Sequence, residues 1–222
     1  VRIGADVYCI GGTYWGPNEA THLQIYNITN ASWTTHEYVY NKQLRRFGIA
    51  PVGTKIYLLG GEEVNGDAYS SKVYMLDTTN IAAGLQVAGS IAVAVRDPSV
   101  VSWKGVLYLV AGLTVDGPTN LFQIFNPATA ATVIHNEPLP VNAFGASCAV
   151  SPAGTFYFGG GLRMVDPVSG WLVNSSRLWT GPMPEQDIFV APTFLDFWQT
   201  NDTLHLRLDN VTGLGILCSN IP

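Results

Sequence analysis

The stretch KIYLLGG, Lys55–Gly61, decides the fold of this 222-residue chain. It is a short strand-like run that ends in two glycines. The pattern Tyr, two mostly apolar residues, Gly or Ala, then Gly occurs four times: YCIGG from Tyr8, YLLGG from Tyr57, YLVAG from Tyr108 and YFGGG from Tyr157. These tyrosines are 49, 51 and 49 residues apart. Self-similarity at a fixed period of this length is typical of a propeller or another repeat architecture.

A second marker has the same period. An apolar run ends in an Asx residue that is followed by Thr, Pro or Ser, and the spacings are 50, 49 and 48 residues; the four positions are Asn27, Asp77, Asn126 and Asn174. Asx residues favour turns because their side chains hydrogen-bond the backbone two residues further on. A tryptophan after the turn, at Trp33 and Trp179, is a third and weaker marker.

Each unit is predicted to form four short strands. In the second unit these strands are Arg46–Val52, Lys55–Gly60, Ser71–Asp77 and Gly84–Ser90. β-Branched and aromatic residues dominate them, and no helical periodicity competes. The second strand is apolar at successive positions, so we expect both of its faces to be buried between two similar sheets.

The glycine pairs are predicted to be tight exits from the second strand of each sheet. Sheets in a ring crowd together near the axis, where glycine permits positive φ and a close approach of two backbones. The glycines assigned to this role are Gly11, Gly12, Gly60, Gly61, Gly112, Gly160 and Gly161.

With these motifs and the WTGPMP ending at Trp179–Pro184, the chain from Asp6 to about Pro184 resembles the Kelch-repeat β-propeller family. The resemblance implies an all-β, Kelch-like β-propeller of four-stranded antiparallel blades, with four clear repeats and a degenerate fifth. The single domain 1–222 would divide at approximately 6–54, 55–105, 106–154, 155–187 and 188–222. The family includes intracellular adaptors, secreted proteins and galactose-oxidase-like enzymes, so the resemblance is specific for fold and weak for function.

The ends of the chain raise the question of how the ring closes. The residues before Asp6 are too few for a first strand, so we expect Leu214–Ser219 or Ile188–Trp198 to complete the first blade, because an unpaired edge binds other strands. The first alternative would place Cys218 beside Cys9 and allow a disulfide. The other possibility is that the three cysteines are unrelated buried thiols. The terminal strand could instead be donated to a neighbouring subunit, which would give self-assembly.

Composition excludes one class of partner. Charged residues make up 12% of the chain, the formal net charge is −5, and there are 11 Lys and Arg residues. Nucleic acids need basic surfaces, so they are not expected partners.

The longest apolar stretch, Val87–Val95, is too short to span a bilayer. The first residue is Val1, which indicates a processed or partial chain.

Five Asn-x-Ser/Thr triplets indicate the compartment. They lie at Asn27, Asn30, Asn174, Asn201 and Asn210. Chance predicts roughly two, so composition alone is the weaker explanation. We therefore predict N-glycosylation of a secreted or extracellular protein, whose glycans would also keep so uncharged a surface in solution.

No motif for catalysis is present. The four histidines have no metal-ligand spacing, and the sequence offers no match for the two His and two Tyr, one cross-linked to Cys, of a galactose-oxidase-like copper site. We expect no enzyme activity, no catalytic or metal-binding residue and no cofactor. The loop after Glu62 and Glu63, with Asn65 and Asp67, has enough oxygen atoms for a calcium ion, but a solvated hairpin loop is the favoured interpretation.

The loops between second and third strands should emerge on one face, and loops on a rigid scaffold are where binding usually occurs. The ligand-binding candidates in them are Tyr14, Trp15, Asn65, Asp67 and Asp116. The two aromatic rings could stack on a sugar or a partner side chain, or cover the rim of their own blade.

The favoured function is a non-enzymatic extracellular glycoprotein whose propeller is a scaffold for protein interaction or self-assembly. One alternative is a secreted carbohydrate-binding propeller. The other is a fragment of a galactose-oxidase-like enzyme with its catalytic residues elsewhere. The expected partners are a protein or a second copy of the chain, with carbohydrate as the alternative.

Overall fold

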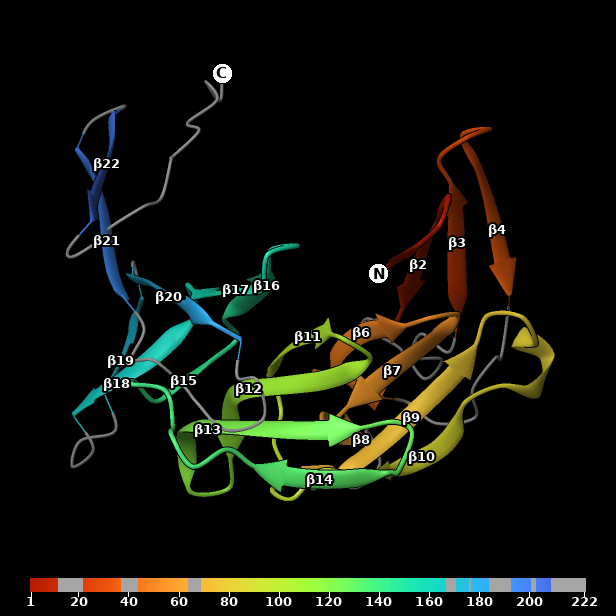
Figure 1. The fold of residues 1–222 in the computed structure, drawn as a ribbon, viewed down its shortest axis with the longest axis horizontal. Coiled ribbons are helices and arrows are strands. Elements are labelled where there is room, and N and C mark those ends of the chain that lie inside the picture. Colours follow the sequence, from red (N-terminus) through yellow and green to blue (C-terminus); the bar gives the residue numbers. More distant parts are fainter. Residues whose placement is uncertain are drawn as a thin grey trace.

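The protein is all-β, and its four antiparallel sheets form a β-propeller, as the sequence predicts (Figure 1). The computed structural model describes residues 1–11, 22–36, 44–63, 69–166, 171–175, 177–183, 193–200 and 203–208. In this part of the chain the one helical element is the 3-10 turn Ile81–Ala83, and no helix is long and apolar enough to cross a membrane.

Chain order is also spatial order in the first two sheets. The first sheet contains β1 (Arg2–Ile3), β2 (Asp6–Ile10), β3 (Leu23–Asn27) and β4 (Ser32–His36). The second contains β6 (Gly48–Val52), β7 (Lys55–Leu59), β9 (Lys72–Asp77) and β10 (Gln86–Ser90). The four strands predicted for the second unit are therefore confirmed, each shorter by one or two residues.

The third and fourth sheets keep this core order and add strands. The third contains β11 (Ser99–Trp103), β12 (Val106–Thr114), β13 (Gly117–Asn126) and β14 (Ala131–Ile134), extended by β15 (Ala143–Phe144), β18 (Leu162–Asp166) and β19 (Trp171–Asn174). The fourth contains β16 (Ser147–Val150), β17 (Thr155–Gly159), β20 (Arg177–Pro182), β21 (Thr193–Thr200) and β22 (Thr203–Leu208). A small sheet pairs β5 (Leu44–Arg45) with β8 (Glu62–Glu63).

The prediction for the third strand of the fourth unit is wrong. The segment that ends at Asn174 is β19, which pairs with β18. In the sequence this hairpin lies between β17 and β20, but it belongs to the third sheet. The third strand is β20, which pairs along the whole of β17. Asn174 is therefore not equivalent to the other three Asx residues. Trp179, buried in the third strand β20, is likewise not equivalent to Trp33, which lies in the fourth strand β4.

The prediction for ring closure through Ile188–Trp198 is also wrong. Most of that segment lies in β21, which pairs with β20 and β22, so the described strands of the expected fifth unit extend the fourth sheet. The first-strand position of the first sheet is taken by Arg2–Ile3, which pairs with β2 across a tight turn. Leu214–Ser219 lies outside the described residues.

The second glycine of each pair lies where two backbones meet. A Cβ on Gly61 or on Gly161 would lie 2.6 Å from a carbonyl oxygen of the segment that leads into the first strand, and the two φ angles are 90° and 74°. The predicted close approach is therefore confirmed. The first position differs between repeats: a Cβ on Gly60 would lie 2.5 Å from the Val95 carbonyl oxygen, a Cβ on Gly160 would meet no atom within 4 Å, and Ala111 adopts a φ of 58° at the equivalent place. The other described members of the set also have positive φ: Gly11, Gly60 and Gly112.

Three of the four Asx markers form the predicted turns. The side-chain oxygens of Asn27, Asp77 and Asn126 accept a hydrogen bond from the backbone N–H two residues further on, at 3.0, 2.9 and 3.0 Å. Each of these turns links the third strand to the outer part of its blade. Because every such blade has this turn, the Asx residues recur with the same period as the glycine pairs.

Hydrophobic clusters fill the spaces between consecutive sheets. Strand β7 contributes Ile56 and Leu58 to the cluster with the first sheet, and Tyr57 and Leu59 to the cluster with the third. Both faces of the strand are buried, as predicted, and each fully buried aliphatic side chain contributes about 1.5–3 kcal/mol. A third cluster joins the third and fourth sheets, and none in the described residues joins the fourth sheet to the first.

Candidate functional site

The candidate site lies at the end of the sheets where the first strand begins and the second strand ends. A residue three positions before the first strand pairs with the residue after the glycine pair, or after the equivalent Ala-Gly pair. The equivalent pairs in three consecutive repeats are Arg45–Glu62, Arg96–Leu113 and Phe144–Leu162. Side chains that are about 50 residues apart in the sequence are thereby gathered at one end of the propeller.

Backbone hydrogen bonds join these segments from sheet to sheet. The Asp97 N–H donates to the Arg46 carbonyl at 2.7 Å, and the Gly145 N–H donates to the Asp97 carbonyl at 2.9 Å. All three residues are left-handed, with φ of 57° for Arg46, 50° for Asp97 and 61° for Gly145. This conformation costs a residue with a side chain about 1–2 kcal/mol. The bonds between sheets hold Arg46 in a backbone conformation that arginine otherwise avoids.

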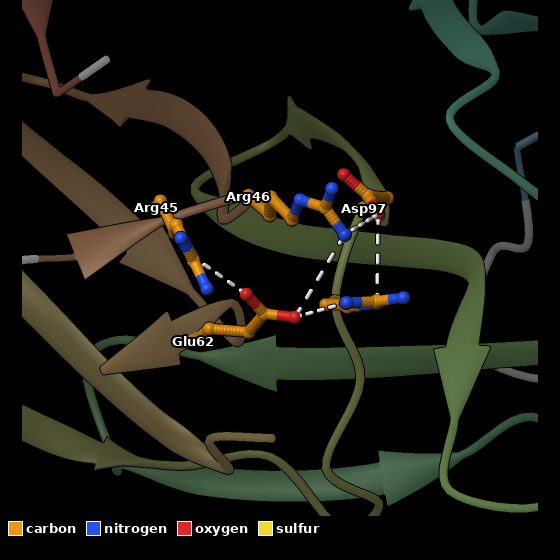
Figure 2. A network of polar contacts seen from close by, with 5 residues as sticks. Arg45, Arg46, Glu62 and Asp97 are labelled. Atoms are coloured by element: carbon orange, nitrogen blue, oxygen red, sulfur yellow. Dashed lines mark hydrogen bonds and ion pairs between the residues drawn. The ribbon is translucent and has the colours of Figure 1, made fainter. Parts of the chain in front are cut away.

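Glu62 is the centre of a charge network built by these segments (Figure 2). It is 5% exposed. Its Oε2 accepts a hydrogen bond from Arg45 Nε at 2.8 Å, and its Oε1 accepts one from the Arg96 guanidinium. A guanidinium nitrogen of Arg46 lies 3.8 Å from Oε1. The pairing of β5 with β8 places Arg45 directly opposite Glu62, so the backbone ladder fixes the first contact.

The two carboxyl groups of the network differ in acidity. Burial raises the pKa of Glu62, but hydrogen bonds from Arg96 and Arg45 lower it by more, so that this pKa lies below its ordinary value. Burial also raises the pKa of Asp97, and Arg46 and Arg96, at 3.8 and 3.9 Å, do not offset it. Glu62 is therefore held as an anion, whereas Asp97 accepts a proton more readily than an ordinary aspartate.

The network carries a surplus of positive charge. Three guanidinium groups surround two carboxylates. The Arg46 side chain is 47% exposed, and within the described residues it donates no hydrogen bond and makes only ion pairs at 3.8 Å. Arg96 packs its guanidinium over the Tyr69 ring, 5.0 Å from the centroid, and its buried Nε makes no hydrogen bond there. Arg46 is thus the donor that remains available to a ligand.

An open pocket of about 560 Å³ begins at this network. Its walls come from the segments that lead into the second, third and fourth sheets and from the β18–β19 hairpin with the glycine pair before it. They are formed by Arg46, Arg96, Asp97, Phe144, Gly145, Gly161, Leu162, Asn174 and Ser175. The pocket combines an exposed guanidinium at one side with an aromatic and an aliphatic side chain at the other. This arrangement suits a ligand that has both an anionic group and an apolar part, because guanidinium forks bind carboxylates in a fixed geometry.

The acidic loop after β8 begins with side chains that are already engaged. Glu63 accepts hydrogen bonds from Lys72 Nζ and from the Tyr74 hydroxyl, each at 2.8 Å. Glu62 is held by arginines, so neither carboxylate faces a vacant cation site. The described ranges contain no group of three His, Cys, Asp or Glu residues that could hold a metal ion.

Of the predicted ligand-binding residues, Asp116 is the one in the described part of the chain, and it does not line this pocket. Asp116 lies in the turn between β12 and β13, where its backbone N–H donates to Thr114 Oγ1 at 3.2 Å. Four of the ligand-binding candidates and one of the structural glycines lie outside the described residues: Tyr14, Trp15, Asn65, Asp67 and Gly12.

The predicted glycosylation sites differ in their surroundings. Asn30 is exposed in the β3–β4 turn, and Asn174 is exposed beside the pocket. Asn27 is half-buried, and its amide nitrogen donates to Asp6 Oδ1 at 2.7 Å. Asn201 and Asn210 lie outside the described residues.

The described cysteines also differ. Cys9 is exposed on β2, and its predicted partner Cys218 lies outside the described residues, so the disulfide stays a prediction. Burial raises the pKa of the Cys148 thiol to about 12, so this group stays protonated and unreactive at neutral pH.

The charge network is the part of the site that reasoning from sequence missed. Arg45, Arg46 and Arg96 are ordinary charged residues when each is viewed alone. A signal was available, because Arg46, Asp97 and Gly145 are 51 and 48 residues apart and therefore follow the period of the tyrosines. Aligning the residues before each first strand would have placed them together.

No family model matches the chain, and no curated protein matches it.

Proposed function

We propose that the protein is a non-enzymatic, extracellular glycoprotein of the Kelch type, whose propeller is a scaffold for binding another protein. The pocket beside the charge network is its contact site, and it binds a carboxylate group of the partner. The single observation that supports this proposal most is the exposed guanidinium of Arg46, which has ion pairs at 3.8 Å and no hydrogen bond within the described residues.

The electrostatics favour an anionic partner group. Glu62 already accepts hydrogen bonds from Arg45 and Arg96, so a carboxylate arriving in the pocket would meet an Arg46 side chain that donates no hydrogen bond within the described residues. A charge-assisted hydrogen bond of this kind contributes about 1.5–3 kcal/mol. Protonation of Asp97, whose pKa is raised, would remove the one carboxylate at the pocket wall that repels such a ligand.

The shape favours a segment of a protein. The pocket is open and its apolar wall includes Phe144 and Leu162. An acidic side chain next to an apolar one, on an extended peptide, would satisfy both sides. Binding sites on rigid scaffolds generally combine an apolar wall with a few placed polar groups.

The extracellular location rests on the sequons and on the low content of charged residues. Asn30 and Asn174 are exposed in the described part of the chain, as an acceptor for a glycan must be. Since Asn174 also lines the pocket, a glycan there would narrow the access of a ligand. The carbohydrate-binding and oxidase-fragment alternatives depend on residues outside the described ones.

The test is fluorescence anisotropy with two labelled peptides, one of alternating glycine and glutamate and one with glutamine in place of glutamate. The protein is used as secreted and after enzymatic removal of N-glycans. We expect the glutamate peptide to bind and the glutamine peptide not to bind. Arg46→Gly should weaken binding about tenfold, because losing one charge-assisted hydrogen bond costs at least about 1.4 kcal/mol. Glycine occupies the equivalent left-handed position at Gly145, so this variant should fold.

The matched control is Arg2→Ala, which removes an exposed arginine whose Nε donates to the nearby Gly4 carbonyl at 2.8 Å. Equal affinity for the two peptides, or equal losses in the two variants, would refute carboxylate recognition by the pocket. Binding of neither peptide, even after removal of glycans, would also refute it.

A further inference from the structure

Each sheet after the first buries one face, its front face, against the sheet before it. In the third sheet the front face carries Leu109 and Phe125, which are fully buried against the second sheet. Gln123 is fully buried there as well, and its side chain accepts from the Val93 N–H at 2.8 Å and donates to the Val93 carbonyl at 3.0 Å. Thr132 donates to a backbone carbonyl of the second sheet at 2.6 Å. The front face is therefore an interface along its whole width.

The same positions in the first sheet are uncovered. The strand register makes Cys9 the counterpart of Leu109, Gln24 the counterpart of Gln123, and Trp33 the counterpart of Thr132. Cys9 and Gln24 are exposed, and Trp33 is 60% exposed. The Trp33 ring lies 5.0 Å from the Tyr26 ring on this face. A glutamine that is fully buried in one repeat and exposed at the equivalent position of another marks an interface without its partner.

The opposite face of each sheet, its back face, is covered by the next sheet in the first three sheets but is partly exposed in the fourth. Tyr8, Tyr57 and Tyr108 lie on back faces, and each is at most 7% exposed because the next sheet covers it. Their counterpart Tyr157 in the fourth sheet is only half-buried. Its neighbour across the ladder, Ala149, is exposed. The alanine that faces Tyr57 in the second sheet is 3% exposed.

The series of backbone hydrogen bonds between sheets also ends at the fourth sheet. The chain of hydrogen bonds runs from Gly145 to Asp97 and from Asp97 to Arg46. Within the described residues the Gly145 carbonyl accepts no hydrogen bond from a further sheet. Figure 1 shows the first and fourth sheets as the two ends of the series of sheets.

We propose that a second copy of the chain covers these faces, with the front face of the first sheet of one copy docked on the back face of the fourth sheet of the other. Every internal interface joins a back face to a front face. Within the described residues, one chain carries an exposed front face on its first sheet and a back face on its fourth sheet that is exposed at Ala149, although Thr180, opposite Tyr157, is 4% exposed. Two identical copies therefore supply both halves of a contact that the protein already forms three times. The contact is heterologous, so copies either close a ring or extend into a chain.

The residues on the two faces suit this contact. Trp33 and Tyr26 provide the large rings that dominate binding energies at protein interfaces. Gln24 is placed to bond the backbone of the partner as Gln123 bonds Val93. The interface uses no residue of the pocket, so its loss and the loss of carboxylate binding are separate results.

The test is sedimentation velocity over a range of protein concentrations, with one variant on each face. Gln24→Lys places a charge on the front face, and Ala149→Arg places one on the back face. Both positions are exposed, so both variants should fold. Each should raise the dissociation constant of self-association at least tenfold, because a charge buried without a partner opposes docking. Val115→Arg, at a turn residue that is 83% exposed, is the matched control and should associate normally.

A mixture of the two variants separates this contact from other kinds of dimer. Each variant alone lacks one half of the interface, but the intact front face of Ala149→Arg can still dock on the intact back face of Gln24→Lys. We expect each variant to be monomeric and the equimolar mixture to form a heterodimer. A native protein that stays monomeric at all concentrations would overturn the proposal, since the faces would then be covered by the chain itself or by another protein. Association that neither variant weakens, or a mixture that stays monomeric, would also overturn it.

Discussion

Glu62→Gln removes the charge at the centre of the network while keeping its shape. Glutamine retains one carbonyl oxygen, so one arginine keeps a neutral acceptor, and the other meets an amide group that is itself a donor. The loss is one charge-assisted hydrogen bond, about 1.5–3 kcal/mol, together with a weakening of the second. Removing one partner of a buried ion pair costs about 3–5 kcal/mol. Because Arg45 and Arg96 are 33% and 25% exposed, water compensates them in part, and we expect a loss of about 3 kcal/mol.

The pH dependence distinguishes the charge from the packing. The pKa of Glu62 is lower in the folded protein than its ordinary value of 4.5. Its ionised form therefore stabilises the protein fully above that value, and this stabilisation is lost as the pH falls through the folded-state pKa. The difference between native protein and Glu62→Gln should be full at neutral pH and shrink in acid.

Urea unfolding followed by tryptophan fluorescence measures this difference at each pH. Glu137→Gln, at an exposed glutamate in the loop after β14, is the control and should change the free energy of unfolding little. A loss for Glu62→Gln that is the same at neutral and acid pH would mean that shape and not charge is responsible. No loss at neutral pH would refute the role of the network in stability.

Three further results are expected. Asp97→Asn should stabilise the protein at neutral pH, because burial raises the Asp97 pKa and stability is lost as the pH rises through it; a lower urea midpoint would contradict this. Gly61→Ala should lower the free energy of unfolding at least twice as much as Gly160→Ala, because both have positive φ, worth about 1–2 kcal/mol, but only the first adds a Cβ 2.6 Å from a carbonyl oxygen; equal losses would exclude the clash. Peptide mapping after glycan release should find higher occupancy at exposed Asn30 than at Asn27, whose amide is hydrogen-bonded, and the reverse order would refute this reasoning.

The fold was predictable because its signals are local. The exit from each second strand needs glycine at one fixed backbone position, and Gly61 and Gly161 meet that need in repeats that share little else. The Asx turns at Asn27, Asp77 and Asn126 are likewise set by a side chain and the N–H two residues away. Such features survive as sequence patterns because few residue types can replace them.

The errors arose where a distant pairing decides the structure. The β18–β19 hairpin ends in an Asn-Ser dipeptide that looks like the Asx marker, and only its pairing with β15 reveals that it belongs to the third sheet. The charge network was missed for a related reason. Arg96 is 34 residues from Glu62, and no local pattern states that the pairing of strands brings them into contact.

The hydrogen bonds that join neighbouring sheets at the axis use only main-chain atoms of Arg46, Asp97 and Gly145. The side chains at these three places take no part in those bonds, so this link between sheets demands a left-handed backbone there and does not depend on what projects from it. Chemically unrelated residues already occupy the three places in one molecule. Exchanging them repeat by repeat would change the charge of the pocket, from cationic to acidic or neutral, while the architecture beneath stays the same.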